Sequence, residues 1–358
     1  MVHHTIKILP TTCIIILLLA SGCRKDKPED VTTKLPEHGA IVLNEGGWGN
    51  NEAELSVIDY SDMSITNGAF AKLNGRGLGD VAQDVAVYGS RIYVTVWGSN
   101  TVEAIDRKSG KSSRIDFGDR GPRYLECAGG KVYVSCYSPT SVVRIDTSTL
   151  QIEATCQLSG LQPEGLCING SNLYVLNTWK QDAAGNPEYD STMSVVDLTT
   201  FSETRKITVG TNPQKIKKLD NSHLAISYTG DYADMHGGLA IVDLNDMSIR
   251  HINTNISNMD TYNGHIYYYA HNYGEAWNGR IHIVNGITLQ ETTITLSETG
   301  GYSAQYYPYA ININQTTGEI YIAGAQYGAN GDIYCFAPSG TLKWVLEAGP
   351  LPSKIAEL

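Results

Sequence analysis

The segment from Arg91 to Asp106 reads RIYVTVWGSNTVEAID, and the segment from Lys131 to Asp146 repeats its pattern as KVYVSCYSPTSVVRID. In each, two apolar stretches flank a short polar loop, and the alternation of apolar and polar side chains is typical of β-strands. The pattern recurs in four further segments, which contain Leu173–Val175, Leu224–Ile226, Ile266–Tyr268 and Ile320–Ile322. With one strand before and one after this pair, each unit spans roughly 40 to 50 residues, the spacing of a propeller blade.

The two ends of the chain complete one shared unit. The first unit, from Ala40 to Asp59, lacks the inner strand that precedes the later units. The C-terminal segment Pro350–Leu358 resembles Asn212–Ile216, which begins the fifth unit. We therefore predict an all-β, seven-bladed β-propeller whose ring is closed by the C-terminal strand completing blade one. Such closure removes open sheet edges, which invite aggregation.

The N-terminus carries the features of a secretory signal. A weakly basic start precedes an apolar run from Cys13 to Ala20 that is too short to span a bilayer. Leu19–Cys23 resembles a bacterial lipobox, which implies lipidation of Cys23, and an ordinary signal peptide with a chance cysteine is the alternative. We expect residues 1–22 to be a signal peptide, residues 23–38 a flexible tether and residues 39–358 the propeller.

The composition of the chain restricts the classes of partner and the chemistry of its cysteines. The chain carries a net charge of −11, and removal of the signal with its single lysine leaves −12, so a nucleic-acid partner is not expected. Five cysteines follow Cys23, without zinc-ligand spacing, and lie in apolar runs, as buried thiols do. The sequence does not decide whether a Cys127–Cys136 or a Cys156–Cys167 disulfide forms. The five are Cys127, Cys136, Cys156, Cys167 and Cys335.

The loops are strongly asymmetric. Short turns join strands one to two and three to four, on one face of the ring, whereas long, aromatic loops join strands two to three on the other. Tyr and Trp, with 22 and 5 copies against 4 Phe, suit wet binding surfaces. Rigid scaffolds keep such loops for binding. We predict ligand binding by Trp48, Trp97, Tyr137, Trp179, Tyr189, Tyr232, His236, Tyr273, Trp277, Tyr307 and Tyr327.

Catalytic signals are weak, and we expect a protein that is not an enzyme. The chain has no G-x-S-x-G, H-E-x-x-H or phosphate-loop motif. His236 and His271, near Asp231, Asp234 and Glu275, form a pattern that suits a metal or a general base, and scattered polar loop residues explain it equally. The sequence requires no cofactor. Asn50–Glu52 is a stretch where calcium would be an option, although its spacing is not specific.

The units quoted above, with Tyr-Val followed by Ile-Asp and with Asn-Pro or Gly-Pro at their start, resemble the YncE-like propeller family. Together with the lipobox and the aromatic loops, they are similar to BtuG-type surface lipoproteins of Bacteroides, which capture vitamin B12. The resemblance implies an outer-membrane protein, lipid-anchored and exposed at the cell surface. It implies binding of cobalamin or a related corrinoid and its transfer to a TonB-dependent transporter of BtuB type. A glycan-binding lipoprotein and a lactonase-like or quinoprotein-like propeller enzyme are the alternatives.

Overall fold

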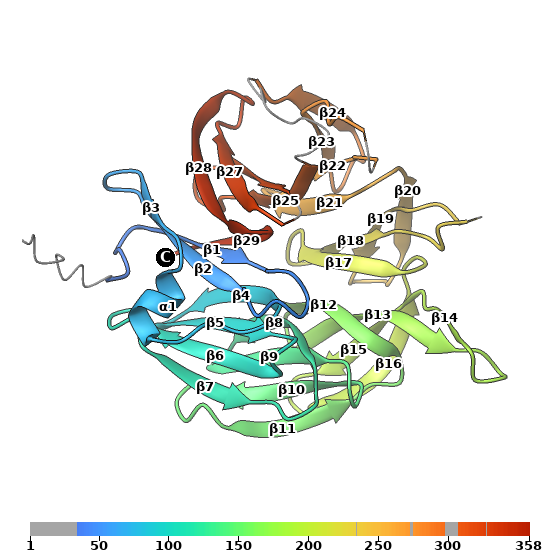
Figure 1. Cartoon of the computed structure of the whole chain (residues 1–358). Coiled ribbons are helices and arrows are strands. Elements are labelled where there is room, and N and C mark those ends of the chain that lie inside the picture. The colour runs from blue at the N-terminus through green and yellow to red at the C-terminus, as the bar shows by residue number, and fades with distance from the viewer. Residues whose placement is uncertain (1–33, 234, 273–274, 298–306, 327) are drawn as a thin grey trace, which may run out of the picture. The chain divides into compact units, whose positions relative to one another are not determined.

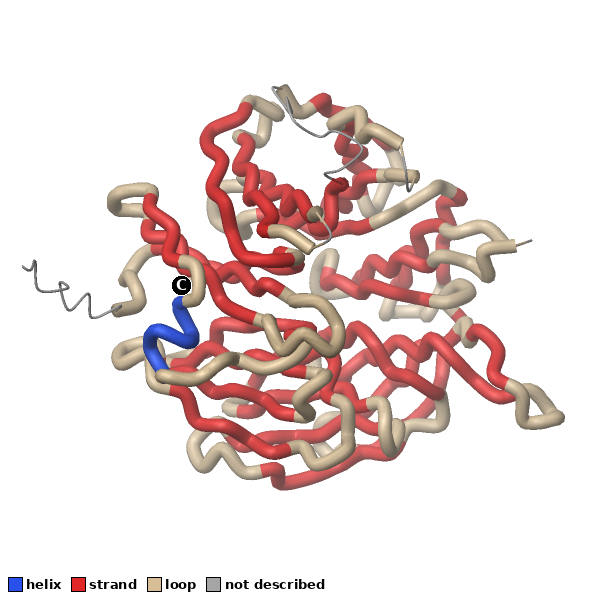
Figure 2. Tube along the Cα trace, in the orientation of Figure 1, coloured by secondary structure: helices blue, strands red, loops and turns tan. Residues whose placement is uncertain are grey.

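Seven antiparallel sheets stand around a central channel in the computed structural model, which describes residues 34–233, 235–272, 275–297, 307–326 and 328–358. Figure 1 shows the sheets as blades, and Figure 2 shows that strands make up most of the ring. The predicted all-β, seven-bladed propeller is confirmed. The one α-helix in the described residues is α1 (Ala69–Asn74), a short segment between blades one and two.

The strands of the first four blades are given from the channel outwards. Blade one contains β29 (Pro352–Glu357), β1 (Gly39–Asn44), β2 (Glu54–Asp59) and β3 (Ser64–Thr66). Blade two contains β4 (Ala82–Tyr88), β5 (Arg91–Val96), β6 (Thr101–Asp106) and β7 (Ser112–Asp116). Blade three contains β8 (Pro122–Ala128), β9 (Lys131–Cys136), β10 (Ser141–Asp146) and β11 (Ile152–Gln157). Blade four contains β12 (Leu161–Asn169), β13 (Asn172–Gln181), β15 (Thr192–Asp197) and β16 (Ser202–Thr208), with β14 (Pro187–Tyr189) paired to β13.

The last three blades follow the same order. Blade five contains β17 (Pro213–Lys218), β18 (His223–Tyr228), β19 (Gly238–Asp243) and β20 (Ile249–Asn253). Blade six contains β21 (Asn258–Tyr262), β22 (His265–Tyr269), β23 (Arg280–Asn285) and β24 (Glu291–Thr295). Blade seven contains β25 (Tyr307–Ile313), β26 (Ile320–Ala325), β27 (Asn330–Phe336) and β28 (Leu342–Pro350).

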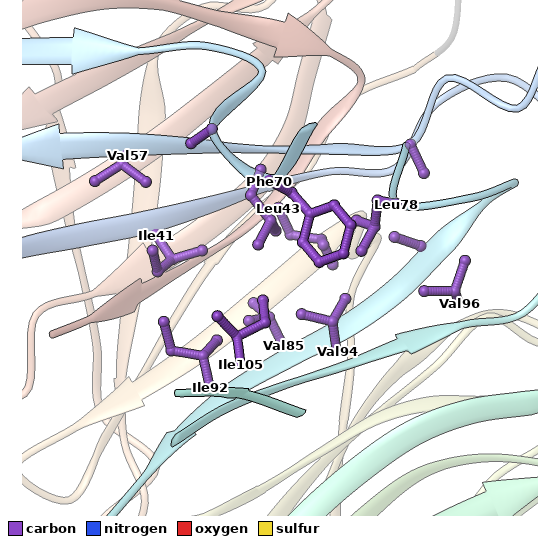
Figure 3. Packing of buried hydrophobic residues seen from close by; sticks show 14 of the residues in the cluster. Ile41, Leu43, Val57, Phe70, Leu78, Val85, Ile92, Val94, Val96 and Ile105 are labelled. Carbon is purple, nitrogen blue, oxygen red and sulfur yellow. The ribbon is translucent and has the colours of Figure 1, made fainter. Parts of the chain in front are cut away.

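The hydrophobic core lies between blades. Each core cluster joins side chains of two neighbouring sheets, because the alternating strands present apolar residues to the blade on either side. Between blades one and two, Ile41 and Leu43 pack toward Val85 and Val94, and Phe70 of α1 covers them (Figure 3). This packing holds the blades at fixed positions around the channel.

The C-terminal strand closes the ring as predicted. β29 pairs antiparallel with β1, so that Val42 lies opposite Ile355. The backbone amide of Ile355 also donates to Asn312 Oδ1 of blade seven at 3.1 Å. Lys354 Nζ lies 2.6 Å from Asp84 Oδ1 of blade two, so the last strand is bonded to the blades on both sides.

The structure shows whether the cysteines of the propeller form disulfides. All five cysteines of the propeller are free thiols, so neither candidate bridge is formed. Burial raises the pKa of four of them, Cys127, Cys136, Cys167 and Cys335, to about 12, which suits inert packing groups. Cys23 and the predicted signal peptide lie outside the described residues. Within them, no helix is long and apolar enough to cross a membrane.

The end of the predicted tether belongs to the packed structure. Leu35 is buried against the core between blades one and two, and the backbone carbonyl of His38 accepts from the amide of Tyr60. The chain therefore reaches the propeller a few residues before the predicted boundary at residue 39.

Asp84 is expected to be a stability determinant. Its carboxylate accepts from Lys354 and from the backbone amide of Leu125 at 3.0 Å, so one side chain bonds blades one, two and three. Asp84→Ala should lower the free energy of unfolding by about 2–3 kcal/mol, measured by urea denaturation. Asp62→Ala, which removes an exposed carboxylate from a single turn, should cost less than about 1 kcal/mol. Equal losses for both variants would contradict this role.

Candidate functional site

The elaborated side of the ring, here called the loop face, carries the connections from the second to the third strand of each blade. The opposite turn face carries the tight turns, such as the one between β23 and β24. Three groups of aromatic side chains lie on the loop face. We call them the Trp48 cluster (Trp48, Trp97 and Tyr137), the arm cluster (Trp179, Tyr189 and Tyr232) and the Tyr307 cluster (His271, Tyr307 and Tyr309).

The Trp48 cluster spans blades one to three. The rings of Trp48 and Trp97 lie 4.5 Å apart with a tilt of 38°, and Trp97 meets the edge of Tyr137 at 6.2 Å. Trp48 is 65% exposed, whereas the other two rings are half-buried. An exposed indole supported by two fixed rings offers a large apolar surface to a ligand.

Arg123 supports this cluster from the inner strand β8. Its guanidinium carbon Cζ lies 4.8 Å from the Trp97 ring and 4.7 Å from the Tyr137 ring, in cation–π contact with both. Its Nη2 lies 3.0 Å from Glu164 Oε1, and the Tyr137 hydroxyl donates to the same carboxylate. Burial raises the pKa of Glu164 to about 7, and the nearby Arg123 opposes this rise. The arrangement fixes the position of Trp97 from below.

Gly121 allows the close approach of Trp97. Its φ of 59° lies in the left-handed region, which disfavours side chains. A Cβ atom there would lie 3.2 Å from Trp97 Nε1, which is tighter than ordinary van der Waals contact. Glycine at position 121 therefore allows the Trp97 ring to lie close to the backbone.

The loop that carries Trp48 is held by two carboxylates. Asp80 accepts from the backbone amide of Gly49 at 3.0 Å and from that of Asn51 at 3.3 Å. Glu52 Oε1 accepts from the amide of Gly47 at 3.0 Å and from the side chain of Asn50 at 3.1 Å. Trp48 thus sits on a loop ordered before any ligand arrives, which reduces the entropy cost of binding.

The arm cluster joins blades four and five. β13 runs beyond the sheet and pairs with β14, so Trp179 lies directly opposite Tyr189 in a hairpin that projects at the right of Figure 1. Their rings lie 4.6 Å apart, and Tyr232 of the β18–β19 loop meets Tyr189 at 6.0 Å. Tyr232 is 73% exposed and has a φ of 61°, a left-handed conformation that costs energy for a bulky residue. Asp231 fixes this turn by accepting from the backbone amide of Met235 at 2.8 Å.

The Tyr307 cluster lies on blades six and seven. The His271 and Tyr307 rings are parallel within 8° at 6.4 Å, and Tyr307 meets Tyr309 at 6.0 Å. The Tyr309 hydroxyl donates to Glu45 of blade one, and burial raises the pKa of that carboxyl above its usual range. This hydrogen bond connects blade seven to Glu45, the residue directly after β1, where the loop that carries Trp48 begins.

Comparison with known proteins supports the fold. No protein-family model and no curated protein matches the chain. Among solved structures, a quinoprotein alcohol dehydrogenase-like protein of Bacteroides thetaiotaomicron superposes with a TM-score of 0.61 at 14% identity, covering 88% of this chain and 77% of that chain. Hydrazine synthase of Kuenenia stuttgartiensis gives 0.57 at 13%, with 82% and 89% covered, and apo AztD of Citrobacter koseri gives 0.54 at 10%, with 90% and 98% covered. These likenesses show the propeller fold alone.

One predicted site residue belongs to the core instead. Trp277 is 6% exposed and packs with Tyr269, whose ring centroid lies 5.4 Å away, and with Ile281. The β22–β23 loop folds this ring back between blades six and seven, so it presents no surface to a ligand. Tyr273 and Tyr327 lie outside the described residues.

The predicted group of polar residues does not form one site among the described residues, and Asp234 lies outside them. His236 is exposed, and His271 contacts the backbone carbonyl of Glu275 at 2.8 Å through Nε2. In the described part of the chain, no three His, Cys, Asp or Glu side chains converge as metal ligands. Arg123 and Glu164, by contrast, were not predicted. The signal for them was a charged residue directly after Pro122 and Pro163, at the start of an inner strand.

Asp80 is expected to keep the Trp48 loop ordered. Asp80→Ala removes the acceptor for the amides of Gly49 and Asn51, so their hydrogen exchange should accelerate by about tenfold or more, as measured by NMR or mass spectrometry. Asp182→Ala is the matched control, because it removes a similar carboxylate from the tip of the β13–β14 hairpin. Unchanged exchange at Gly49 in the Asp80 variant would show that other contacts order this loop.

Proposed function

We propose that this protein captures cobalamin or a related corrinoid on its loop face and passes it to a TonB-dependent outer-membrane transporter of BtuB type. The observation that carries the proposal is the pair of exposed rings, Trp48 and Tyr232, each resting on a half-buried aromatic partner on the same face. Exposed apolar patches with a polar rim often mark sites of ligand or protein binding.

The chemistry of a corrinoid suits this surface. A corrinoid has a broad macrocycle that can lie on aromatic rings and a rim of amide groups that form hydrogen bonds. Each stacked ring contributes about 0.5–1.5 kcal/mol beyond the area it buries. Several such rings held in place by Arg123, Asp80 and Glu52 would act together without first being ordered.

The contacts of Glu164, the buried carboxyl group below Trp97, favour binding over catalysis. Glu164 is engaged by Arg123 and by the Tyr137 hydroxyl, so it is not presented to a ligand as a general acid or base would be. Glycans also stack on exposed aromatic rings, which makes a glycan the second ligand class for the same face.

The titration that tests this proposal uses cyanocobalamin and the purified protein in a calorimeter. Trp48→Ala and Tyr232→Ala should each weaken binding by about two- to tenfold, because each removes one exposed ring. Ile287→Ala is the matched control, since this side chain is 52% exposed on the turn face and should leave affinity unchanged. Absence of binding heat with cyanocobalamin would reject the corrinoid. Binding of soluble polysaccharides with the same dependence on Trp48 would assign the face to glycans.

The anchor and the location at the cell surface rest on the sequence around Cys23. When the protein is expressed in bacteria fed with labelled palmitate, the wild type should incorporate label and fractionate with the outer membrane. Cys23→Ser should lose the label and appear in the soluble fraction. An unlabelled wild-type protein would contradict the lipoprotein assignment.

A further inference from the structure

The central channel is a second region with binding chemistry, and it shares Tyr309 of the Tyr307 cluster with the loop face. It encloses a volume of about 750 Å³ and is lined by the inner strands of all seven blades. Its lining includes three lysines near the middle of these strands, Lys215, Lys217 and Lys354, together with the carboxyl groups of Asp84, Glu126 and Asp260.

Two of the lysines are already paired. Lys354 Nζ lies 2.6 Å from Asp84 Oδ1, and Lys217 Nζ lies 2.9 Å from Asp260 Oδ1. Both carboxylates also accept a backbone amide from the next blade, since Asp260 Oδ2 binds the amide of Ile313 at 2.8 Å as Asp84 binds that of Leu125. These pairs belong to the joints between blades.

Lys215 has no such partner. Its Nζ donates to the neutral Asn258 Oδ1 at 2.5 Å, and no carboxylate of the described residues forms an ion pair with it. Burial, followed by repulsion from Lys217, lowers the pKa of Lys215 to about 7. A charged ammonium group here is therefore short of a counter-charge.

Glu126 faces the same channel from blade three. Among the described residues its carboxyl group has neither a hydrogen bond nor an ion pair, and burial raises its pKa to about 7. Blade four stands between Glu126 and Lys215 and contributes Gly165, Leu166 and Cys167 to the wall, none of them charged. The described part of the channel thus contains an ammonium group without a counter-charge and a carboxyl group without a hydrogen bond.

We propose that the channel binds a small oxyanion, a carboxylate or a phosphate, at the Lys215 ammonium group. Asp260 and Asp84 compensate the charges of Lys217 and Lys354, so Lys215 supplies the positive charge for the anion. Glu126 in its protonated form donates a hydrogen bond to the same anion. The site does not depend on the corrinoid proposal, because none of its groups belongs to the aromatic clusters.

The protonation of the site gives binding a defined pH dependence. Lys215 is charged and Glu126 is neutral below about pH 7, so affinity should fall as the pH rises through that value. The other charged groups that face Lys215 are Lys217, Lys354, Asp84 and Asp260. Because these are held in ion pairs, the pH dependence belongs to Lys215 and Glu126. Binding near pH 7 should take up protons.

Calorimetric titration of the purified protein with sodium succinate and with sodium phosphate tests the proposal. Affinity should be about tenfold higher near pH 6 than near pH 8, and the heat should vary with the ionisation enthalpy of the buffer in the direction of proton uptake. The anion with the lower Kd identifies the class of the ligand, a carboxylate or a phosphate. If neither binds, or if binding is independent of pH, the proposal is overturned.

Variants of Lys215 assign the binding to the channel. Lys215→Met should lower the affinity for the anion by at least about tenfold. Lys215→Arg keeps the positive charge and should retain binding. The Arg variant also tests the site if the Met variant fails to fold. Lys206→Met, on the exposed outer strand β16, is the matched control. Cyanocobalamin titration should be unchanged in the Lys215 variants. Anion binding that persists in Lys215→Met would place the ion elsewhere.

Discussion

The pairing of β29 with β1 is the constraint on which the rest of the structure depends. It brings the last strand of the chain to the first blade and leaves no blade without its inner strand. Lys354 and Ile355 of this strand then bond to blades two and seven, so closure is made by side chains as well as by the backbone ladder. A closed ring holds each blade against two neighbours and fixes the positions from which the loops start.

This rigidity explains how a surface rich in exposed aromatic rings remains ordered. Trp48 and Tyr232 lie on loops, yet each loop is fixed by a carboxylate that accepts backbone amides, Asp80 in one case and Asp231 in the other. In the Trp48 cluster, Arg123 links the rings of Trp97 and Tyr137 to the buried carboxylate of Glu164 in the next blade. Exposed aromatic rings lie on the loop face, whereas the channel contains ion pairs between blades together with Lys215 and Glu126, which form no ion pair among the described residues.

Period-two alternation and the repeated pattern predict the blades, because each inner and middle strand must present apolar residues to its neighbours. The closing strand follows from the likeness of Pro350–Leu358 to Asn212–Ile216. The same pattern could not separate exposed loop rings from buried ones. Trp277 and Trp179 stand in similar long segments, but the first folds into the core and the second lies on an extended hairpin. Arg123 was not predicted because the binding residues were sought in the loops, whereas Arg123 stands at the start of the inner strand β8.

The decisive measurement is a crystal structure of the protein with cyanocobalamin bound. We expect density for the macrocycle on the loop face, in contact with the Trp48 indole or the Tyr232 ring, with Asp80 and Arg123 in the positions described above. Density confined to the channel or to the turn face would contradict the claim that the exposed rings form the binding surface.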